Sequence, residues 1–249
     1  MAAPVGLCAL LAMFAFAGNS ILCRVALTRT ATDPAAFTLV RLAAGALALA
    51  VLVLARRRGG VRPPGAGGDT RSALALFAYA AAFSYAYVRL PAGTGALLLF
   101  GAVQATMIGA GLRGGERLAP HHLAGFLLAL AGLVALVLPG VGAPAPAAAA
   151  LMLGAGVAWG MYSLRGRGSA DPLGQTAGNF ARALPGAALL AAGALAMGAL
   201  RLDVAGALLA ATSGALASGV GYTVWYAALR RLSATEAGIV QLSVPVLAA

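Results

Sequence analysis

Two segments of the chain carry residues in the same order: RLPAGTGA at residues 89–96 and RLSATEAG at residues 231–238, 142 residues later. The same offset pairs Phe83 with Trp225. Two further pairs lie upstream in each half, in the same order. Asp33-Pro34 corresponds to Asp171-Pro172 at an offset of 138, and Gly18-Asn19-Ser20 corresponds to Ala158-Trp159-Gly160. Chance similarity between alanine-rich helices is the alternative, but it accounts poorly for an ordered set. The pattern predicts an internal repeat.

The composition around these motifs excludes a soluble protein. Of the 249 residues, 61% are hydrophobic and only 9% are charged, whereas soluble domains are about half apolar and about a quarter charged. The two cysteines exclude a disulfide scaffold. The net charge of +11 comes entirely from arginines, which cluster between apolar runs as in membrane loops. We therefore expect the lipid bilayer, and no nucleic acid, as a partner.

Eight apolar runs are long enough to cross a bilayer: 5–27, 34–55, 72–90, 93–112, 121–140, 147–165, 173–200 and 204–229. A ninth begins near residue 234 and reaches the end of the sequence at Ala249. We predict an all-α polytopic membrane protein with two repeats of five transmembrane helices, at residues 1–140 and 141–249. Because five is odd, the repeats have inverted topology. On this expectation the second repeat is truncated, with about nine of ten helices present, and its full counterpart would run to about residue 282.

The arginines also predict the orientation. Eleven of them fall on one side of the predicted spans and three on the other: Arg56, Arg57, Arg58, Arg62, Arg71, Arg113, Arg117, Arg165, Arg167, Arg230 and Arg231 against Arg29, Arg89 and Arg201. The arginine-rich side is expected to be cytoplasmic, since loops rich in positive charge stay inside. This predicts a multi-pass protein of the cell (inner) membrane with a cytoplasmic N-terminus.

Several short motifs, taken together, resemble the EamA-type branch of the drug/metabolite transporter superfamily. They are Gly18-Asn19-Ser20, Arg41-Leu42-Ala43-Ala44, the 89–96 segment, Gly115-Glu116-Arg117-Leu118, the run from Gly125 to Gly140, Ala158-Trp159-Gly160 and Val244-Pro245-Val246. The resemblance covers essentially the whole chain and implies ten helices in two inverted repeats that transport small metabolites, often for export. One departure is Val103, which stands where family members often have proline; Gln104 lies beside it.

Polar and aromatic residues inside the spans are the candidates for substrate binding, because such groups are costly in lipid. They are Asn19, Arg41, Tyr79, Gln104, Trp159, Tyr162, Asn179, Arg182, Tyr222 and Gln241. Arg41 and Arg182 lead the set and predict an anionic or zwitterionic solute, since arginine binds carboxylate or phosphate through two donors. The alternative is that both arginines bond helix-end carbonyls, and that Gln104 bridges helices. Gly214 and Ser218 are interpreted as a helix-packing pair.

The acidic residues and histidines point away from catalysis. All six acids lie in loops or at helix ends: Asp33, Asp69, Glu116, Asp171, Asp203 and Glu236. We expect Glu116 to cap a helix or to pair with a loop arginine. His121 and His122 point different ways at a helix start and predict an interfacial position, with no metal and no cofactor. We therefore predict a secondary transporter that moves a small metabolite by alternating access, in the direction of export. A non-transporting scaffold or decayed paralogue is the alternative, an intramembrane enzyme ranks below both, and a homodimer stays open.

Overall fold

The computed structural model describes residues 5–58, 67–116, 124–125, 127–128, 131–132 and 144–248. Its elements, in chain order, are α1 (Val5–Arg29), α2 (Pro34–Arg58), α3 (Thr70–Tyr87), α4 (Ala92–Arg113), α6 (Pro146–Gly166), α7 (Pro172–Ala196), α8 (Val204–Thr212), the π-helix η1 (Ser213–Val220), α9 (Gly221–Leu229), α10 (Ala234–Val240) and α11 (Ser243–Ala248). Every element in this part of the chain is helical, so the predicted all-α fold is confirmed.

Acidic residues begin four of these helices. The carboxylates of Asp33, Asp69, Asp171 and Asp203 accept hydrogen bonds from backbone N–H groups in the first turns of α2, α3, α7 and α8, at 2.8 to 3.2 Å. A side-chain acceptor at this position satisfies donors that have no partner within the helix, and its negative charge suits the helix dipole. The acids are therefore engaged at helix ends, as expected from the sequence.

The predicted spans agree with the helices to within a few residues, with one correction. The span expected at 173–200 ends earlier, because α7 stops at Ala196 and Gly198 adopts a φ of +66°. That left-handed conformation is accessible to glycine at little cost and ends the helix. The predicted span 121–140 lies largely outside the described residues.

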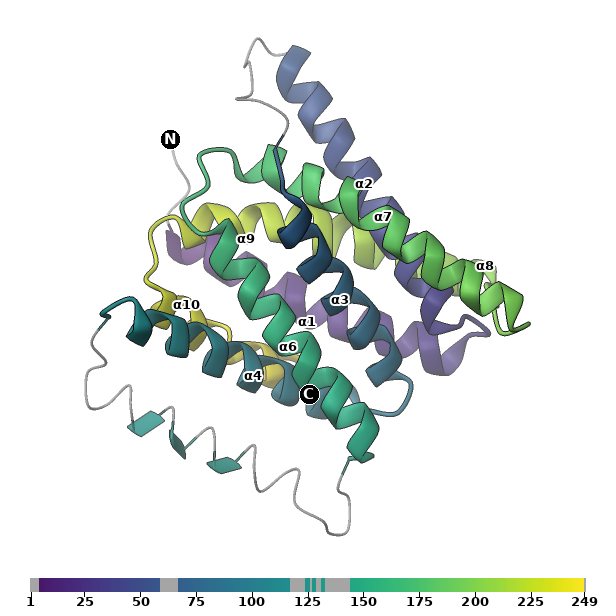
Figure 1. Ribbon diagram of the computed structural model, residues 1–249, viewed down its shortest axis with the longest axis horizontal. Coiled ribbons are helices and arrows are strands. Elements are labelled where there is room, and N and C mark those ends of the chain that lie inside the picture. The colour runs from purple at the N-terminus through teal and green to yellow at the C-terminus, as the bar shows by residue number, and fades with distance from the viewer. Residues whose placement is uncertain are drawn as a thin grey trace.

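The helices of the two halves pack mainly against each other. The most extensive contacts join α3 to α6, α2 to α7, α4 to α6 and α2 to η1, and Figure 1 shows α3 and α6 running side by side across the face of the bundle. Each of these pairs combines a helix before residue 141 with one after it. The interior therefore lies between the two predicted repeats.

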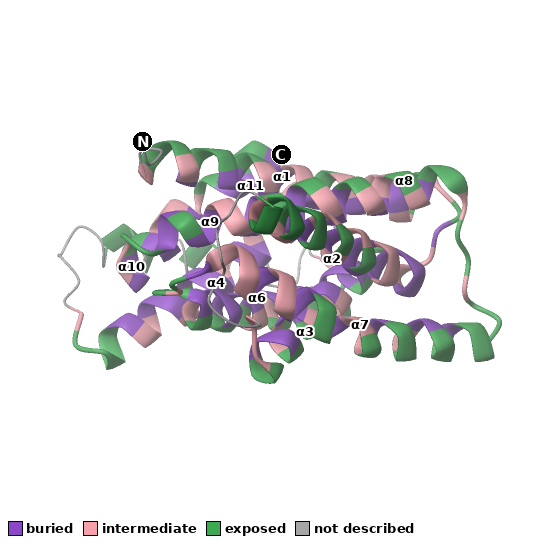
Figure 2. Ribbon diagram, turned by 90° about the horizontal axis from the view of Figure 1, so that it is seen from above, coloured by how far each residue is buried: buried purple, intermediate pink, exposed green. Residues whose placement is uncertain are grey.

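Many leucine side chains face outward, while several polar side chains of the spans are buried. Leu10, Leu47, Leu128 and Leu189 are all more than half exposed, whereas Asn19 and Arg41 are at most 2% exposed. Figure 2 shows exposed residues on the outer faces of the helices and buried residues on the inner ones. Six of the described helices are long and apolar enough to cross a membrane. This distribution suits a protein whose surroundings are lipid.

The last long span combines three elements, α8, η1 and α9, in one run from Val204 to Leu229. Its middle part is a π-helix, which often marks a functional position. Gly214 lies there with its α-carbon against the backbone carbonyl of Arg41, where a Cβ atom would clash. The glycine thus lets η1 approach α2 at the level of Arg41.

Candidate functional site

The side chain of Arg41 on α2 lies at the centre of the bundle and is 1% exposed. Its Nε donates to the hydroxyl of Ser218 on η1 at 3.1 Å. Its Nη2 donates to the hydroxyls of Tyr79 on α3, at 3.1 Å, and Tyr222 on α9, at 2.8 Å. Arg41 therefore joins groups from both halves of the chain.

Asn19 on α1 extends this network. Its Nδ2 donates to the Tyr79 hydroxyl at 3.1 Å, and its Oδ1 accepts from the hydroxyl of Ser213 on η1 at 2.6 Å. The Tyr79 and Tyr222 hydroxyls also lie 3.2 Å apart. We call this set of six residues the Arg41 cluster: Asn19, Arg41, Tyr79, Ser213, Ser218 and Tyr222.

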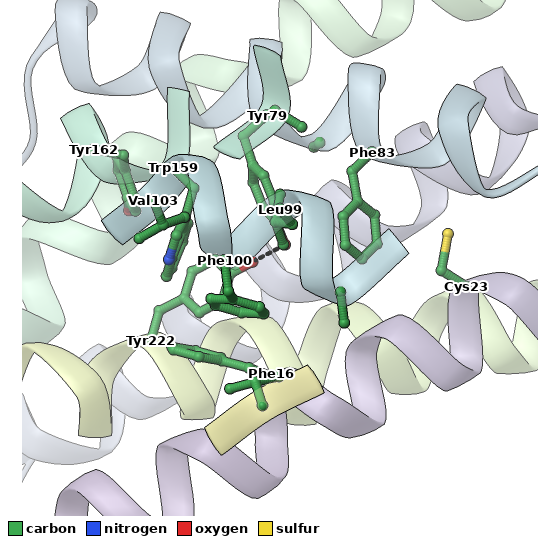
Figure 3. Close-up of a cluster of buried hydrophobic side chains, with 14 of the residues drawn as sticks. Phe16, Cys23, Tyr79, Phe83, Leu99, Phe100, Val103, Trp159, Tyr162 and Tyr222 are labelled. Atoms are coloured by element: carbon green, nitrogen blue, oxygen red, sulfur yellow. Dashed lines mark hydrogen bonds between the residues drawn. The ribbon is translucent and has the colours of Figure 1, made fainter. Parts of the chain in front are cut away.

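Aromatic rings surround the Arg41 cluster. The guanidinium carbon of Arg41 lies 5.1 Å from the ring centre of Tyr79 and 5.0 Å from that of Phe83, within the range of cation–π attraction. In Figure 3, Tyr79 and Trp159 converge on Tyr222 from their separate helices, and Phe16 lies beside Tyr222. The Trp159 and Tyr222 ring centres are 4.4 Å apart. The walls of the site are thus flat, apolar surfaces with hydroxyl groups at one side.

The positive charge of Arg41 has no carboxylate partner in the part of the chain that the structure describes. All six acids lie there, and the three ion pairs found use other arginines. Its Nη1 is buried without a hydrogen-bond partner among these residues. A buried charge held only by neutral groups is costly, and arginine has donors arranged to bind a carboxylate in two-pronged fashion. The cluster is therefore chemically prepared for an anionic group.

A second buried contact lies next to the cluster. Trp159 on α6 donates from Nε1 to the Oε1 of Gln241 at 2.8 Å, and the Gln241 amide donates to the carbonyl of Ala237 at 2.9 Å. Gln104 on α4 is 2% exposed and has its α-carbon beside Gly238 of α10. Trp159 and Gln241 thus connect α6 to α10, and Gln104 places α4 beside α10; the bridging interpretation of the Gln104 side chain stays a prediction.

Asn179 and Arg182 bond groups outside the Arg41 cluster, whereas the ring of Tyr162 lies beside those of Trp159 and Tyr222, with ring centres 5.6 and 6.4 Å apart. Asn179 is buried and accepts from the backbone N–H of Asp69 at 2.9 Å, so it holds the start of α3. Arg182 is exposed, and its Nη1 donates to the carbonyls of Gly67, at 2.9 Å, and Gly178, at 3.1 Å. Neither carbonyl belongs to the Arg41 cluster, so Arg182 and Asn179, both predicted among the substrate-binding residues, make their hydrogen bonds apart from it. The Tyr162 hydroxyl is buried and has no partner among the described residues.

Four side chains of this region were not among the predicted site residues. Ser213 and Ser218 contribute hydroxyls to the cluster, and Phe16 and Phe83 contribute rings. The packing interpretation holds for Gly214 but is incomplete for Ser218, which accepts from Arg41. The five-residue spacing of the two serines does not place them on one face of an α-helix, so the sequence did not predict that both face the cluster. They share a face because this segment is a π-helix. Phe83 did carry a signal, since the repeat pairs it with Trp225.

Three ion pairs join the two halves at one end of the bundle, which we call the arginine-rich end. Arg56 contacts both carboxylate oxygens of Asp171 at 2.7 and 2.8 Å. Two further pairs are Arg165 with Asp69 at 2.7 Å and Arg167 with Glu116 at 3.2 Å. Each pair links a residue before position 141 to one after it. These contacts fasten the two halves together on that side.

Glu116 does more than pair with Arg167. Its carboxylate also accepts from the backbone N–H groups of Ala234 and Thr235, at 3.0 and 3.1 Å, and so caps α10. Burial opposes ionisation here, but these hydrogen bonds and those of Thr235 and Arg167 side chains lower the pKa of Glu116 to about 2. Burial also acts on Asp69, and hydrogen bonds from Ser72 and Arg165 lower its pKa to about 2. The expectation that Glu116 caps a helix or pairs with an arginine is confirmed on both counts.

Within the described residues, no group of three or more histidine, cysteine or acidic side chains could hold a metal ion. His121 and His122 lie outside the described residues. The Arg41 cluster is the candidate site because it is buried and joins both halves of the chain, with neutral hydroxyl and amide groups around one guanidinium.

An apolar helical bundle with helices long enough to cross a membrane, and with a charged cluster buried between them, defines a polytopic membrane protein. The sequence pattern of the EamA-like transporter family matches residues 4–138 and 146–249, and the chain belongs to this family. An uncharacterized protein of Pseudomonas aeruginosa is 62% identical over 240 residues, which cover 96% of this chain and 82% of the relative. A crystal structure, described simply as that of a protein, has a similar fold with a TM-score of 0.72 and a sequence identity of 21%. The match covers 100% of this chain and 87% of the chain in the crystal structure. The last comparison supports the fold alone.

Proposed function

We propose that the protein is a secondary transporter that exports a small carboxylate-bearing metabolite, anionic or zwitterionic, by alternating access. The observation that carries this proposal is the buried guanidinium of Arg41, which has an unpartnered Nη1 and no acid beside it in the described chain. Membership of a transporter family supports the general activity. The direction of export rests on the resemblance to the family alone.

The chemistry of the Arg41 cluster selects the substrate class. A carboxylate would neutralise Arg41 and accept from Nη1, while the Tyr79 and Tyr222 hydroxyls could donate to a second oxygen. A cationic solute without a carboxylate would meet the positive charge of Arg41 and no compensating acid. The aromatic walls suit an apolar body, and their ring faces tolerate an ammonium group.

The ion pairs of the arginine-rich end supply a gate for alternating access. Arg41 is 1% exposed, so a substrate reaches it only when the halves move apart. At the arginine-rich end such movement separates Arg56 from Asp171, Arg165 from Asp69 and Arg167 from Glu116. We infer that this end, proposed to face the cytoplasm, is closed in the state described here.

The substrate class is tested with purified protein in liposomes and a panel of labelled carboxylates, matched amides and amines. We expect carboxylates to be transported and their uncharged amides to be transported at least 10-fold more slowly. Arg41→Lys keeps the charge but loses the two-pronged donors, so it should lower transport strongly. Arg182→Lys is the matched control, because Arg182 bonds only backbone carbonyls, and it should transport normally. Normal carboxylate transport by Arg41→Lys, or a preference for amines, would refute the proposal.

The orientation is tested by single-cysteine labelling on a background without Cys8 and Cys23. Ala170 and Ala199 are both exposed and lie in the loops at opposite ends of α7. We expect a membrane-impermeant thiol reagent added outside cells to modify Ala199→Cys and to spare Ala170→Cys. The reverse labelling would invert the proposed topology and place the ion pairs on the outer side.

A further inference from the structure

A groove of about 530 Å³ runs along the outer surface between α3 and α6. Its lining comes from one stripe of each helix: Arg71, Leu74, Ala75 and Ala78 on α3, and Ala158, Met161 and Arg165 on α6. The residues on each helix follow at spacings of three and four, so they share one face. Both arginines lie at the same end, and the rest of the lining is apolar.

The two arginines give the mouth of the groove a positive charge. Arg71 is exposed and has no ion-pair partner among the described residues, which include all six acids of the chain. Arg165 bonds Asp69 through Nη2 at 2.7 Å and Ser72 through Nε at 3.0 Å. Its Nη1 makes no hydrogen bond within the described chain and can serve a further acceptor. The mouth of the groove therefore carries the full positive charge of Arg71 and the partly neutralised charge of Arg165.

The floor of the groove is narrow and smooth because it consists largely of small residues. Ala75, Ala78 and Ala158 leave room between the longer side chains of Leu74 and Met161, both of which are exposed. The groove opens on the outer face of α3 and α6, whereas the Arg41 cluster lies in the interior. It is therefore a surface that lipid, and not the transported solute, would meet.

We propose that this groove binds an anionic phospholipid, with the phosphate at Arg71 and Arg165 and one acyl chain along the alanine floor. Basic residues beside an apolar channel at one end of a membrane helix pair match both parts of such a lipid. A zwitterionic lipid has a positive headgroup that weakens its attraction to the arginines. Because both arginines belong to the arginine-rich end, the lipid comes from the leaflet on that side.

Thermal unfolding of the full chain in detergent, with added lipid, tests the proposal. Phosphatidylglycerol should raise the melting temperature by several degrees, while phosphatidylcholine with the same acyl chains and inorganic phosphate should have smaller effects. Arg71→Gln should reduce the phosphatidylglycerol effect by at least half. Arg57→Gln is the matched control: it removes an exposed arginine from the same end, outside the groove, and should respond as the original protein does.

A second pair of variants tests the apolar half of the groove without changing charge. Ala78→Phe fills the floor and should lower the amount of phosphatidylglycerol retained in native mass spectrometry. Ala188→Phe adds the same ring on an exposed position of α7 and should not. Equal retention by both phenylalanine variants, an unchanged response in Arg71→Gln, or an equal effect of phosphatidylcholine would overturn the proposal. An equal effect of inorganic phosphate would make the site an anion site and exclude the lipid.

Discussion

At the arginine-rich end of the bundle, Arg56, Arg165 and Arg167 each face a carboxylate, at 2.7 to 3.2 Å. In the buried centre, Arg41 faces three hydroxyl groups and two aromatic rings, and no carboxylate among the described residues. The same side chain therefore occurs in two electrostatic settings within one molecule. Where both partners belong to the protein, the pair fastens helices together. Where no carboxylate partner lies among the described residues, the proposed substrate would neutralise the charge.

This difference predicts opposite effects of removing an arginine in the two regions. Arg41→Met should lower the transport rate at least 100-fold, because the carboxylate of the proposed substrate loses its positively charged partner. It should leave the thermal stability unchanged or raised, since replacing a buried charge with an apolar side chain of similar size is often neutral or stabilising. Transport in liposomes and thermal unfolding of the same preparation measure both effects.

The control for that result is Arg56→Met. It leaves Asp171, which is 9% exposed, without its bidentate partner, and should lower the free energy of unfolding by about 1–3 kcal/mol. Substrate affinity should stay within a few-fold, because Arg56 does not touch the cluster. If Arg41→Met were the less stable of the two variants, the contrast between the regions would fail.

The sequence predicted the helices and most of the central cluster, but it could not separate Arg41 from Arg182. Both lie deep in long apolar segments, eight and eleven residues after an N-capping aspartate. Depth along a helix says nothing about which face a side chain occupies. Arg41 points toward η1, where Gly214 allows close approach. Arg182 points outward and donates a hydrogen bond to the carbonyl of Gly67, which packs closely against Gly178.

The interactions that the sequence did not predict are those between distant segments. Ser213 and Ser218 join the cluster because the chain forms a π-helix there, and an α-helical pattern does not anticipate that register. The acids were expected at helix ends, and they lie there. Their partners, such as Arg56 for Asp171 across 115 positions, depend on how α2 packs against α7. The local sequence pattern therefore predicts that a segment is a helix, whereas the packing of the helices determines which helix ends come into contact.

The tyrosine hydroxyls of the cluster give a smaller effect than Arg41. Tyr222→Phe removes an acceptor for Arg41 and a donor for the substrate, and should raise the KM for a carboxylate about 10-fold, equivalent to one lost hydrogen bond to a charged group. Tyr87→Phe is the matched control, because the Tyr87 hydroxyl bonds the carbonyl of Ala92 outside the cluster. Equal KM values for these two variants would remove Tyr222 from the proposed site.

Reversing an ion pair tests the other region. Asp171→Arg alone brings two arginines together at the arginine-rich end and should open it, raising by several-fold the labelling rate of Ser163→Cys, a position that is buried in the closed state. Arg56→Asp in the same chain restores an attractive pair and should return the rate toward its original value. If the double variant were labelled as fast as the single one, the pair would not act as a gate. Labelling of Ala199→Cys serves as the control for general unfolding.

The smallest expected effect is that of pH on the arginine-rich end between pH 8 and pH 5. Burial raises the pKa of both carboxylates, but hydrogen bonds outweigh it. Those from Ser72 and Arg165 lower the pKa of Asp69 to about 2. Those from α10 and Arg167 lower the pKa of Glu116 to about 2. Their ordinary values are 3.8 and 4.5. Because both values are lower in the folded protein, the carboxylates stabilise it fully above pH 4.5 and lose this contribution as the pH falls toward 2. We therefore expect a constant melting temperature from pH 8 to pH 5 and a decline below that range, which Asp69→Asn with Glu116→Gln should make shallower. A transition centred near pH 6 would indicate histidine titration instead and would contradict the assignment of the pH response to these two carboxylates.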